Sequence, residues 1–180
     1  MINEKGLCAA MKAAWRVGGY EVAGYGEENI LFINGYGWCV AAPQRQMPRR
    51  ALALLVEHVG QIPTAEAFRV HKKEGAQTIM LDMALEPKDG IERLLGEEDA
   101  IEIRQTAMMW KGWRVWQKPE TQTVLAYDDA LTAIGEGEPG AFGNMLVWDE
   151  GGELVCVLPG KDVLDTALRE LLEQTMLAGE

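Results

Sequence analysis

The sequence predicts an α+β protein in which helices cover an antiparallel sheet. Two observations carry this prediction. Pairs of short apolar runs that suit β-strands occur four times along the chain, and each pair is followed by a proline and by a stretch with helical spacing. Short polar or glycine-containing segments separate the two runs of a pair, which favours hairpins and therefore antiparallel pairing.

The first and last of these repeated β-hairpin/helix units also align with each other. Each copy consists of a strand-like run, a proline and a helical stretch: 29–33, Pro43 and 50–57 in the first copy, and 144–148, Pro159 and 166–173 in the last. We therefore expect a single compact domain over residues 1–180 with an internal duplication. Residues 1–60 and 121–180 form the similar units, related by a pseudo-twofold, and residues 61–120 form intervening hairpin and helix units.

The first unit shows clear start and stop signals. Asn3 is placed to cap a helix over 3–17, which Gly18 and Gly19 end. Strands are expected over 20–25, 30–33 and 38–41. Pro43 cannot donate to a strand ladder and so ends the last of them, and Pro48 suits the first turn of the helix that follows.

The later units are assigned on the same grounds. The predicted elements are a hairpin over 67–72 and 78–83, a short helix after Pro87, a hairpin over 106–110 and 113–117, a helical stretch after Pro119 that includes Val124, a hairpin over 145–148 and 154–158, and a long amphipathic helix capped by Asp162.

Composition excludes several classes of protein. No run approaches the roughly 18 apolar residues that cross a bilayer, and the start of the chain lacks a secretory apolar segment. The three cysteines are odd in number and scattered, which favours a reducing, cytoplasmic setting. The chain contains no serine, which excludes a serine nucleophile.

Charge divides the chain into two parts. Residues 1–76 contain nine Lys/Arg and seven Asp/Glu, whereas residues 77–180 contain eight and twenty-one, within a net charge of -11. An acidic half repels nucleic acid and anionic membranes, and it attracts basic protein surfaces. We therefore expect a protein partner, and neither direct nucleic-acid binding nor membrane binding.

Three patterns typical of catalytic or cofactor sites are weak here. The segment 135–140 has the glycine spacing of a dinucleotide loop, but it follows a predicted helix and carries two glutamates where a pyrophosphate binds. His58 and His71 lack zinc-ligand spacing. Cys39 and Cys156 occupy corresponding strands, so burial explains them better than a nucleophile paired with His58. No catalytic residue, metal or cofactor is predicted.

Tryptophans and carboxylates provide the candidate binding residues. A turn at Lys111-Gly112 makes Trp110 and Trp113 cross-strand neighbours and places Trp116 on the opposite face. Such rings, interleaved with cations, are typical of interface anchors, although ordinary core packing is the simpler explanation. Carboxylates on loops around the fourth hairpin can imitate phosphates, although a solvated acidic face has the same composition. The predicted partner-binding residues are Glu97, Glu98, Asp99, Glu102, Trp110, Trp113, Trp116, Glu136, Glu138, Asp149, Glu150 and Glu153.

The resulting hypothesis is a non-enzymatic acidic protein that engages a basic surface of another protein. Its specific form is a nucleic-acid mimic that inhibits a nucleic-acid-binding protein or nuclease, as DNA-mimic anti-restriction and anti-CRISPR proteins of bacteriophages do. The alternative is a small-molecule sensor or enzyme with a pocket between the duplicated halves, lined by Trp38 and Trp148. A homo-oligomer that buries the tryptophans is a third possibility.

Overall fold

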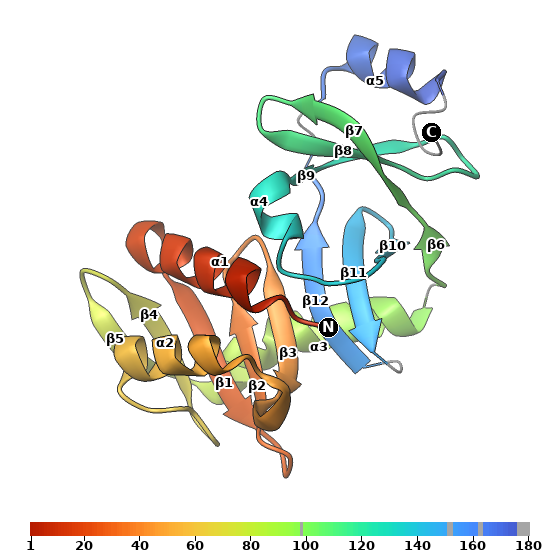
Figure 1. Ribbon diagram of the computed structural model, residues 1–180. Coiled ribbons are helices and arrows are strands. Elements are labelled where there is room, and N and C mark those ends of the chain that lie inside the picture. Colours follow the sequence, from red (N-terminus) through yellow and green to blue (C-terminus); the bar gives the residue numbers. More distant parts are fainter. Residues whose placement is uncertain (98, 151–152, 162–163, 176–180) are drawn as a thin grey trace.

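The computed structural model (Figure 1) describes residues 1–97, 99–150, 153–161 and 164–175 and confirms the predicted α+β class. The helices within these residues are α1 (Glu4–Val17), α2 (Arg49–Val59), α3 (Leu81–Glu97), α4 (Asp129–Thr132) and α5 (Thr166–Glu173), with a short 3-10 helix at Gln44–Gln46. All pairs of strands are antiparallel, and they form a large and a small sheet.

In the part of the chain that the structure describes, the large sheet has nine strands. In spatial order they are β5 (Gly75–Ile79), β4 (Ala67–His71), β1 (Tyr20–Tyr25), β2 (Ile30–Asn34), β3 (Cys39–Pro43), β12 (Glu153–Pro159), β11 (Met145–Glu150), β10 (Gly140–Phe142) and β6 (Ile101–Glu102). The small sheet contains β7 (Arg104–Trp110), β8 (Trp113–Gln117) and β9 (Val124–Asp128). Strands β6 and β10 thus end the large sheet beside the chain that enters the small one.

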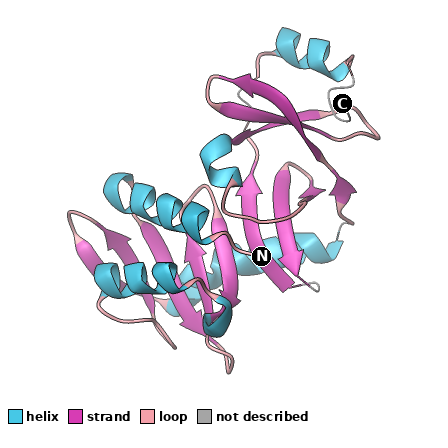
Figure 2. Ribbon diagram, in the orientation of Figure 1, coloured by secondary structure: helices cyan, strands magenta, loops and turns pink. Residues whose placement is uncertain are grey.

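Both faces of the large sheet are covered, which explains its continuous apolar strands. Helices α1 and α2 lie on one face, where Leu7 and Leu55 join the largest cluster of buried side chains. Helix α3 lies on the other face, where Ile91 and Leu95 pack against the cluster that contains Phe32. Figure 2 shows this arrangement as helices before and behind the strands.

Local signals fix the start of α1 as the sequence predicts. The Asn3 side chain accepts a hydrogen bond from the Gly6 N–H at 2.8 Å, which satisfies one of the donors that a helix N-terminus leaves free. Helix α2 follows Pro48 directly and ends at Gly60, whose φ of +91° is a left-handed conformation that favours glycine.

One face of the small sheet packs against α5, and the other faces the main core. Val115, Val124 and Ala126 contribute to a cluster with Leu164 and Leu172, which places α5 over this face. Trp116 and Tyr127 point the other way and belong to the main core, with their rings 6.2 Å apart in an edge-to-face arrangement. The alternation of β8 and β9 therefore connects the small sheet to the rest of the molecule.

The predicted helix boundary at Pro87 is wrong. Helix α3 begins at Leu81 and contains Pro87, so the residues expected to end the second hairpin are helical. The apolar stripe of Ala84, Leu85 and Ile91 continues through the proline and packs on the sheet. This burial outweighs the hydrogen bond that proline cannot donate.

The prediction of a helix that includes Val124 is also wrong, because Val124 is the first residue of strand β9. Pairing with β8, which the sequence does not reveal, selects the strand over the helix. Helix α5 begins later than predicted, after Asp165, whose carboxylate accepts from Leu168 N at 2.9 Å. The expected cap, Asp162, lies outside the described residues.

The strands of the first and last predicted units lie side by side in the large sheet. Strand β3 pairs with β12, with Val40 opposite Cys156, so the order β1-β2-β3 continues as β12-β11-β10. However, α2 covers the large sheet and α5 covers the small one. A pseudo-twofold that relates the two units as wholes is therefore not confirmed. No helix within the described ranges has the length and apolar character needed to span a bilayer.

Candidate protein-binding surface

The β6 end of the large sheet gathers acidic residues from separate parts of the chain. Gly140 of β10 lies opposite both Glu102 of β6 and Val147 of β11, so these three strands run side by side. A Cβ added at Gly140 would lie 2.9 Å from the Cβ of Ala100, which shows how closely the segment before β6 approaches β10. Figure 1 shows the C-terminal end of α3 at this same side of the molecule.

Six of the predicted carboxylates lie on these segments and form what we call the acidic edge. It consists of Glu97 at the end of α3, Asp99 and Glu102 at β6, Glu136 and Glu138 in the segment before β10, and Asp149 on β11. All six residues are exposed. Glu98 lies outside the described residues, and the side chains of Glu150 and Glu153 lie outside the described part of the structure, although their backbones belong to β11 and β12.

Little positive charge offsets the acidic edge. Arg104 donates to Glu102 at 2.6 Å, but both side chains are more than half exposed, where such pairs contribute little. The Asn3 side chain donates to the Glu136 carboxylate at 2.9 Å, and the Met1 ammonium donates to the Glu136 backbone carbonyl at 3.4 Å. Among the described residues, Glu97, Asp99 and Glu138 have no ion-pair partner within 4 Å. In the part of the chain that the structure describes, the carboxylates of the acidic edge thus outnumber the positive groups that contact them.

A surface cavity of about 500 Å³ lies within this edge, between the two sheets. Its volume falls in the range of sites that hold a small molecule or a long side chain. Glu102 and Glu138 supply its negative charge and Arg104 its positive charge. The lining residues are Glu102, Ile103, Arg104, Gln105, Trp116, Gly137, Glu138 and Pro139.

The three clustered tryptophans do not act as one surface. Trp110 and Trp113 are cross-strand neighbours, as predicted, and lie half-buried on the face of the small sheet that α5 covers. Lys111 lies 5.2 Å above the ring of Trp110. Trp116 is only 5 % exposed and belongs to the core, so it offers the cavity no more than a small part of its ring.

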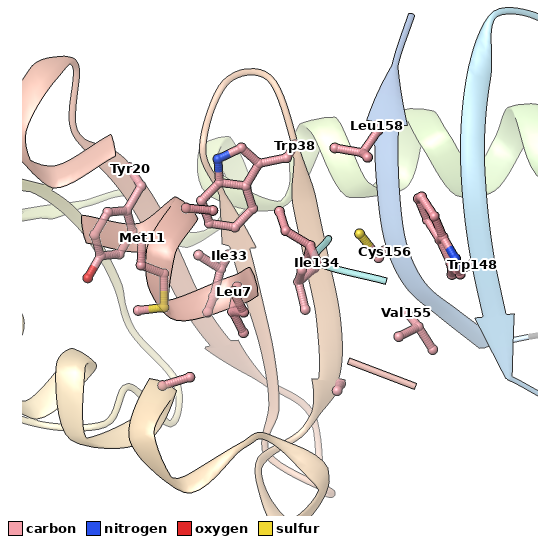
Figure 3. Close-up of a cluster of buried hydrophobic side chains, with 14 of the residues drawn as sticks. Leu7, Met11, Tyr20, Ile33, Trp38, Ile134, Trp148, Val155, Cys156 and Leu158 are labelled. Carbon is pink, nitrogen blue, oxygen red and sulfur yellow. The ribbon is translucent and has the colours of Figure 1, made fainter. Parts of the chain in front are cut away.

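Two other tryptophans, assigned to a ligand pocket in the alternative hypothesis, fill the core. Trp38 and Trp148 are each 4 % exposed. Figure 3 shows them among buried side chains that include Ile33 of β2 and Val155, Cys156 and Leu158 of β12. The backbone of Gly35 covers the Trp38 ring, and Gly135 covers Trp148 in the same way, since a Cβ at either glycine would lie within 2.3 Å of the indole. These contacts leave no space for a ligand at the two rings.

The candidate nucleophiles lack the features of reactive groups. Burial raises the pKa of the Cys39 thiol to about 12, and burial also raises that of Cys156. A thiol of this kind stays protonated and unreactive. His58 is engaged elsewhere, because it stacks on Trp15 at 4.3 Å and hydrogen-bonds to the Tyr20 hydroxyl at 2.9 Å. The described residues contain no group of three His, Cys, Asp or Glu placed to hold a metal ion.

Sequence reasoning missed part of this site. It did not identify Arg104, Gln105 and Pro139 as cavity residues, because the cavity depends on how the two sheets meet. It also missed a groove of about 460 Å³ between α1 and α2, lined by Lys5, Lys12 and Arg50 among others. The sequence signal that could have indicated this groove was the presence of opposite charges, such as Glu4 and Arg50, on the two helices that line it.

Comparisons of the chain with protein-family models, curated proteins and solved structures find no match.

Proposed function

We propose that this chain is a non-enzymatic binding protein whose acidic edge engages a basic surface of another protein. The observation that carries the proposal is the placement of carboxylates from α3, β6, the segment before β10 and β11 at one end of the large sheet. Charges fixed on one side attract an oppositely charged surface at long range and orient it on approach. The few cations nearby leave this attraction available to a partner.

The form of the proposal that we favour is nucleic-acid mimicry. Carboxylates held at the edge of a sheet replace the phosphates that a nucleic-acid-binding protein or nuclease recognises, so the chain blocks that protein's binding channel. The cavity supports this form, because it can receive an arginine or lysine side chain of the partner at Glu138, beside the exposed Arg104–Glu102 pair. The buried thiols and the engaged histidine favour binding over catalysis.

The proposal is tested by neutralising three carboxylates of the edge. A variant with Glu97→Gln, Asp99→Asn and Glu138→Gln keeps the shape of these side chains and removes their charge. Immobilised wild type should retain basic nucleic-acid-binding proteins from a cell extract at low salt, identified by mass spectrometry. We expect the variant to retain them at least about tenfold less, because the field that orients the partner is lost.

The control variant removes the same charge elsewhere. Glu27→Gln, Glu57→Gln and Glu170→Gln alter three exposed glutamates on a turn, α2 and α5. This protein should bind like wild type. Equal binding by the edge variant and wild type, or equal losses in both variants, would contradict a role for the acidic edge.

A further inference from the structure

A surface cavity opens on the α3 face of the large sheet, beside the start of that helix. Ala23 of β1 lies opposite Ala67 of β4, and both pack against Ala84 of α3. Further along the same face, Glu21 lies opposite Arg69. The cavity lies at this pair and has a volume of about 640 Å³, which falls in the range of small-molecule sites. The lining residues are Glu21, Arg69, Thr78, Ile79, Met80 and Met83.

The carboxylate of Glu21 is nearly buried and only partly satisfied. The residue is 7 % exposed. Its Oε1 atom accepts from the Tyr36 hydroxyl at 2.8 Å and from Nε and Nη2 of Arg69 at 3.0 and 2.7 Å. Its Oε2 atom accepts no hydrogen bond from the residues that the structure describes. Because a nearly buried carboxylate oxygen without a donor costs free energy, Oε2 is an acceptor that a ligand in the cavity can satisfy.

Arg69 supplies donors to the same cavity. A guanidinium has five N–H groups, and two of the Arg69 nitrogens donate to Glu21 Oε1. The Arg69 side chain is 51 % exposed, so donors remain for a second anionic group. Because the charges of Glu21 and Arg69 cancel, the pair favours neither a simple cation nor a simple anion. It favours a ligand that brings a positive group to Oε2 and a negative group to the guanidinium.

The rest of the cavity wall is mostly apolar. Met80 is 65 % exposed and Met83 is 60 % exposed, and Ile79 lies beside them in the chain. Methionine side chains are unbranched and flexible, so they adapt to apolar groups of different shapes. A ligand that fits this wall therefore carries an apolar group next to its two charges.

We propose that this cavity binds a free α-amino acid with an apolar side chain. The ammonium donates to Glu21 Oε2, the carboxylate accepts from Arg69, and the side chain packs against Met80 and Met83. An α-amino acid carries both charges on one carbon, which suits an acceptor and a donor that are themselves hydrogen-bonded neighbours. A residue inside a peptide chain has neither charge, and a chain terminus has only one of them. The Glu21–Arg69 pair therefore selects the free amino acid over a peptide.

The amino-acid site and the acidic edge are separate features of the molecule. Six strand positions separate β1 from β6 in the described part of the large sheet, which is about 29 Å. The residues that line the cavity include none of the acidic edge. The variant with the neutralised acidic edge should therefore bind the amino acid like wild type. Either proposal can fail without the other.

The first test follows the methionine methyl groups by NMR while L-leucine, L-methionine or L-phenylalanine is added. The methyl resonances of Met80 and Met83 should shift with a dissociation constant below about 1 mM for at least one of the three amino acids. The resonance of Met109, which is 42 % exposed on β7, should not shift. No shift at Met80 and Met83 with any of the three, or an equal shift at Met109, would overturn the proposal.

Two analogues of the tightest-binding amino acid test the two charges separately. The amide keeps the ammonium and lacks the carboxylate charge, and the corresponding carboxylic acid keeps the carboxylate and lacks the ammonium. Each analogue should bind at least about tenfold more weakly, because it loses one charge-assisted hydrogen bond. An analogue that binds as tightly as the amino acid would show that the site does not recognise both charges, and the proposal would then be wrong.

Substitutions assign the binding to these residues. Glu21→Gln keeps the shape of the side chain, removes the charge opposite the ammonium and should weaken binding at least about tenfold. Met83→Ala removes an exposed side chain, which leaves the fold intact, and should weaken binding about threefold through lost apolar contact. Met109→Ala is the matched control and should bind like wild type. Full affinity in Met83→Ala or in folded Glu21→Gln protein, or an equal loss in Met109→Ala, would contradict the site.

Discussion

Gly6 joins the first helix to the C-terminal half of the molecule, and replacing it by alanine tests that contact. A Cβ on Gly6 would lie 1.9 Å from the carbonyl oxygen of Ala133 and 2.5 Å from its carbonyl carbon. Real contacts of a Cβ are essentially never shorter than 3.0 Å. The Gly6→Ala change therefore forces the start of α1 away from the segment that follows α4 by about 1 Å.

Two effects of Gly6→Ala lower the free energy of unfolding, and one effect raises it. Overpacking against backbone costs about 1–3 kcal/mol. The displacement also strains the hydrogen bond from the Asn3 N–H to the Ile134 carbonyl, now 2.8 Å long, which contributes about 1 kcal/mol. Alanine regains up to about 1 kcal/mol of helix propensity. We expect a net loss of about 2 kcal/mol, which lowers the Tm by about 4–8 °C for a domain of this size.

Thermal unfolding followed by circular dichroism measures this shift, and Gly90→Ala is the matched control. Gly90 lies inside α3, and nothing lies within 4 Å of a Cβ added there. The same substitution should therefore raise the Tm slightly, because helix propensity acts alone. A Gly6→Ala protein as stable as wild type would refute the close contact between α1 and the segment after α4.

Two further predictions concern buried polar groups. Burial lowers the pKa of His58 below its ordinary 6.5, so the folded state binds a proton less readily than the unfolded state; the free energy of unfolding is therefore highest above about pH 6.5 and falls as the solution becomes more acidic. Urea unfolding from about pH 8 to about pH 5 should show a smaller loss of stability in His58→Phe, which keeps an aromatic ring on Trp15. An unchanged loss of stability in this variant would contradict the role of His58. Arg69→Ala should destabilise by about 1–2 kcal/mol, because the nearly buried Glu21 carboxylate loses donors at 2.7 and 3.0 Å and, among the described residues, keeps the Tyr36 hydroxyl as its side-chain donor. Adding Glu21→Gln should recover part of the loss in urea unfolding, and no recovery would argue against an unpaired charge as the cause.

Local sequence signals predicted much of the fold. The Asn3 cap, the strand over 20–25 and the hairpin at Lys111-Gly112 depend on residues close together in the chain, and the structure confirms all three. Pro87 and Val124 were assigned wrongly because their states depend on distant partners. A helix tolerates an internal proline where the apolar face around it is buried, and an apolar stretch forms a strand where it pairs with another strand.

The candidate site shows the same division. Composition identified the acidic residues, but only the pairing of β6, β10 and β11 brings Glu102, Glu138 and Asp149 to one end of the sheet. Alternation correctly separated Trp113 from Trp116. It did not say which of them the large sheet buries, since that depends on how two sheets meet.

Competition with duplex DNA tests the central claim most directly. A protein retained by the acidic edge is purified, and its dissociation constant for this chain is measured with and without a saturating DNA duplex at one salt concentration. The account predicts that DNA displaces the chain, because carboxylates and phosphates occupy the same basic channel. Binding that DNA leaves unchanged would contradict nucleic-acid mimicry.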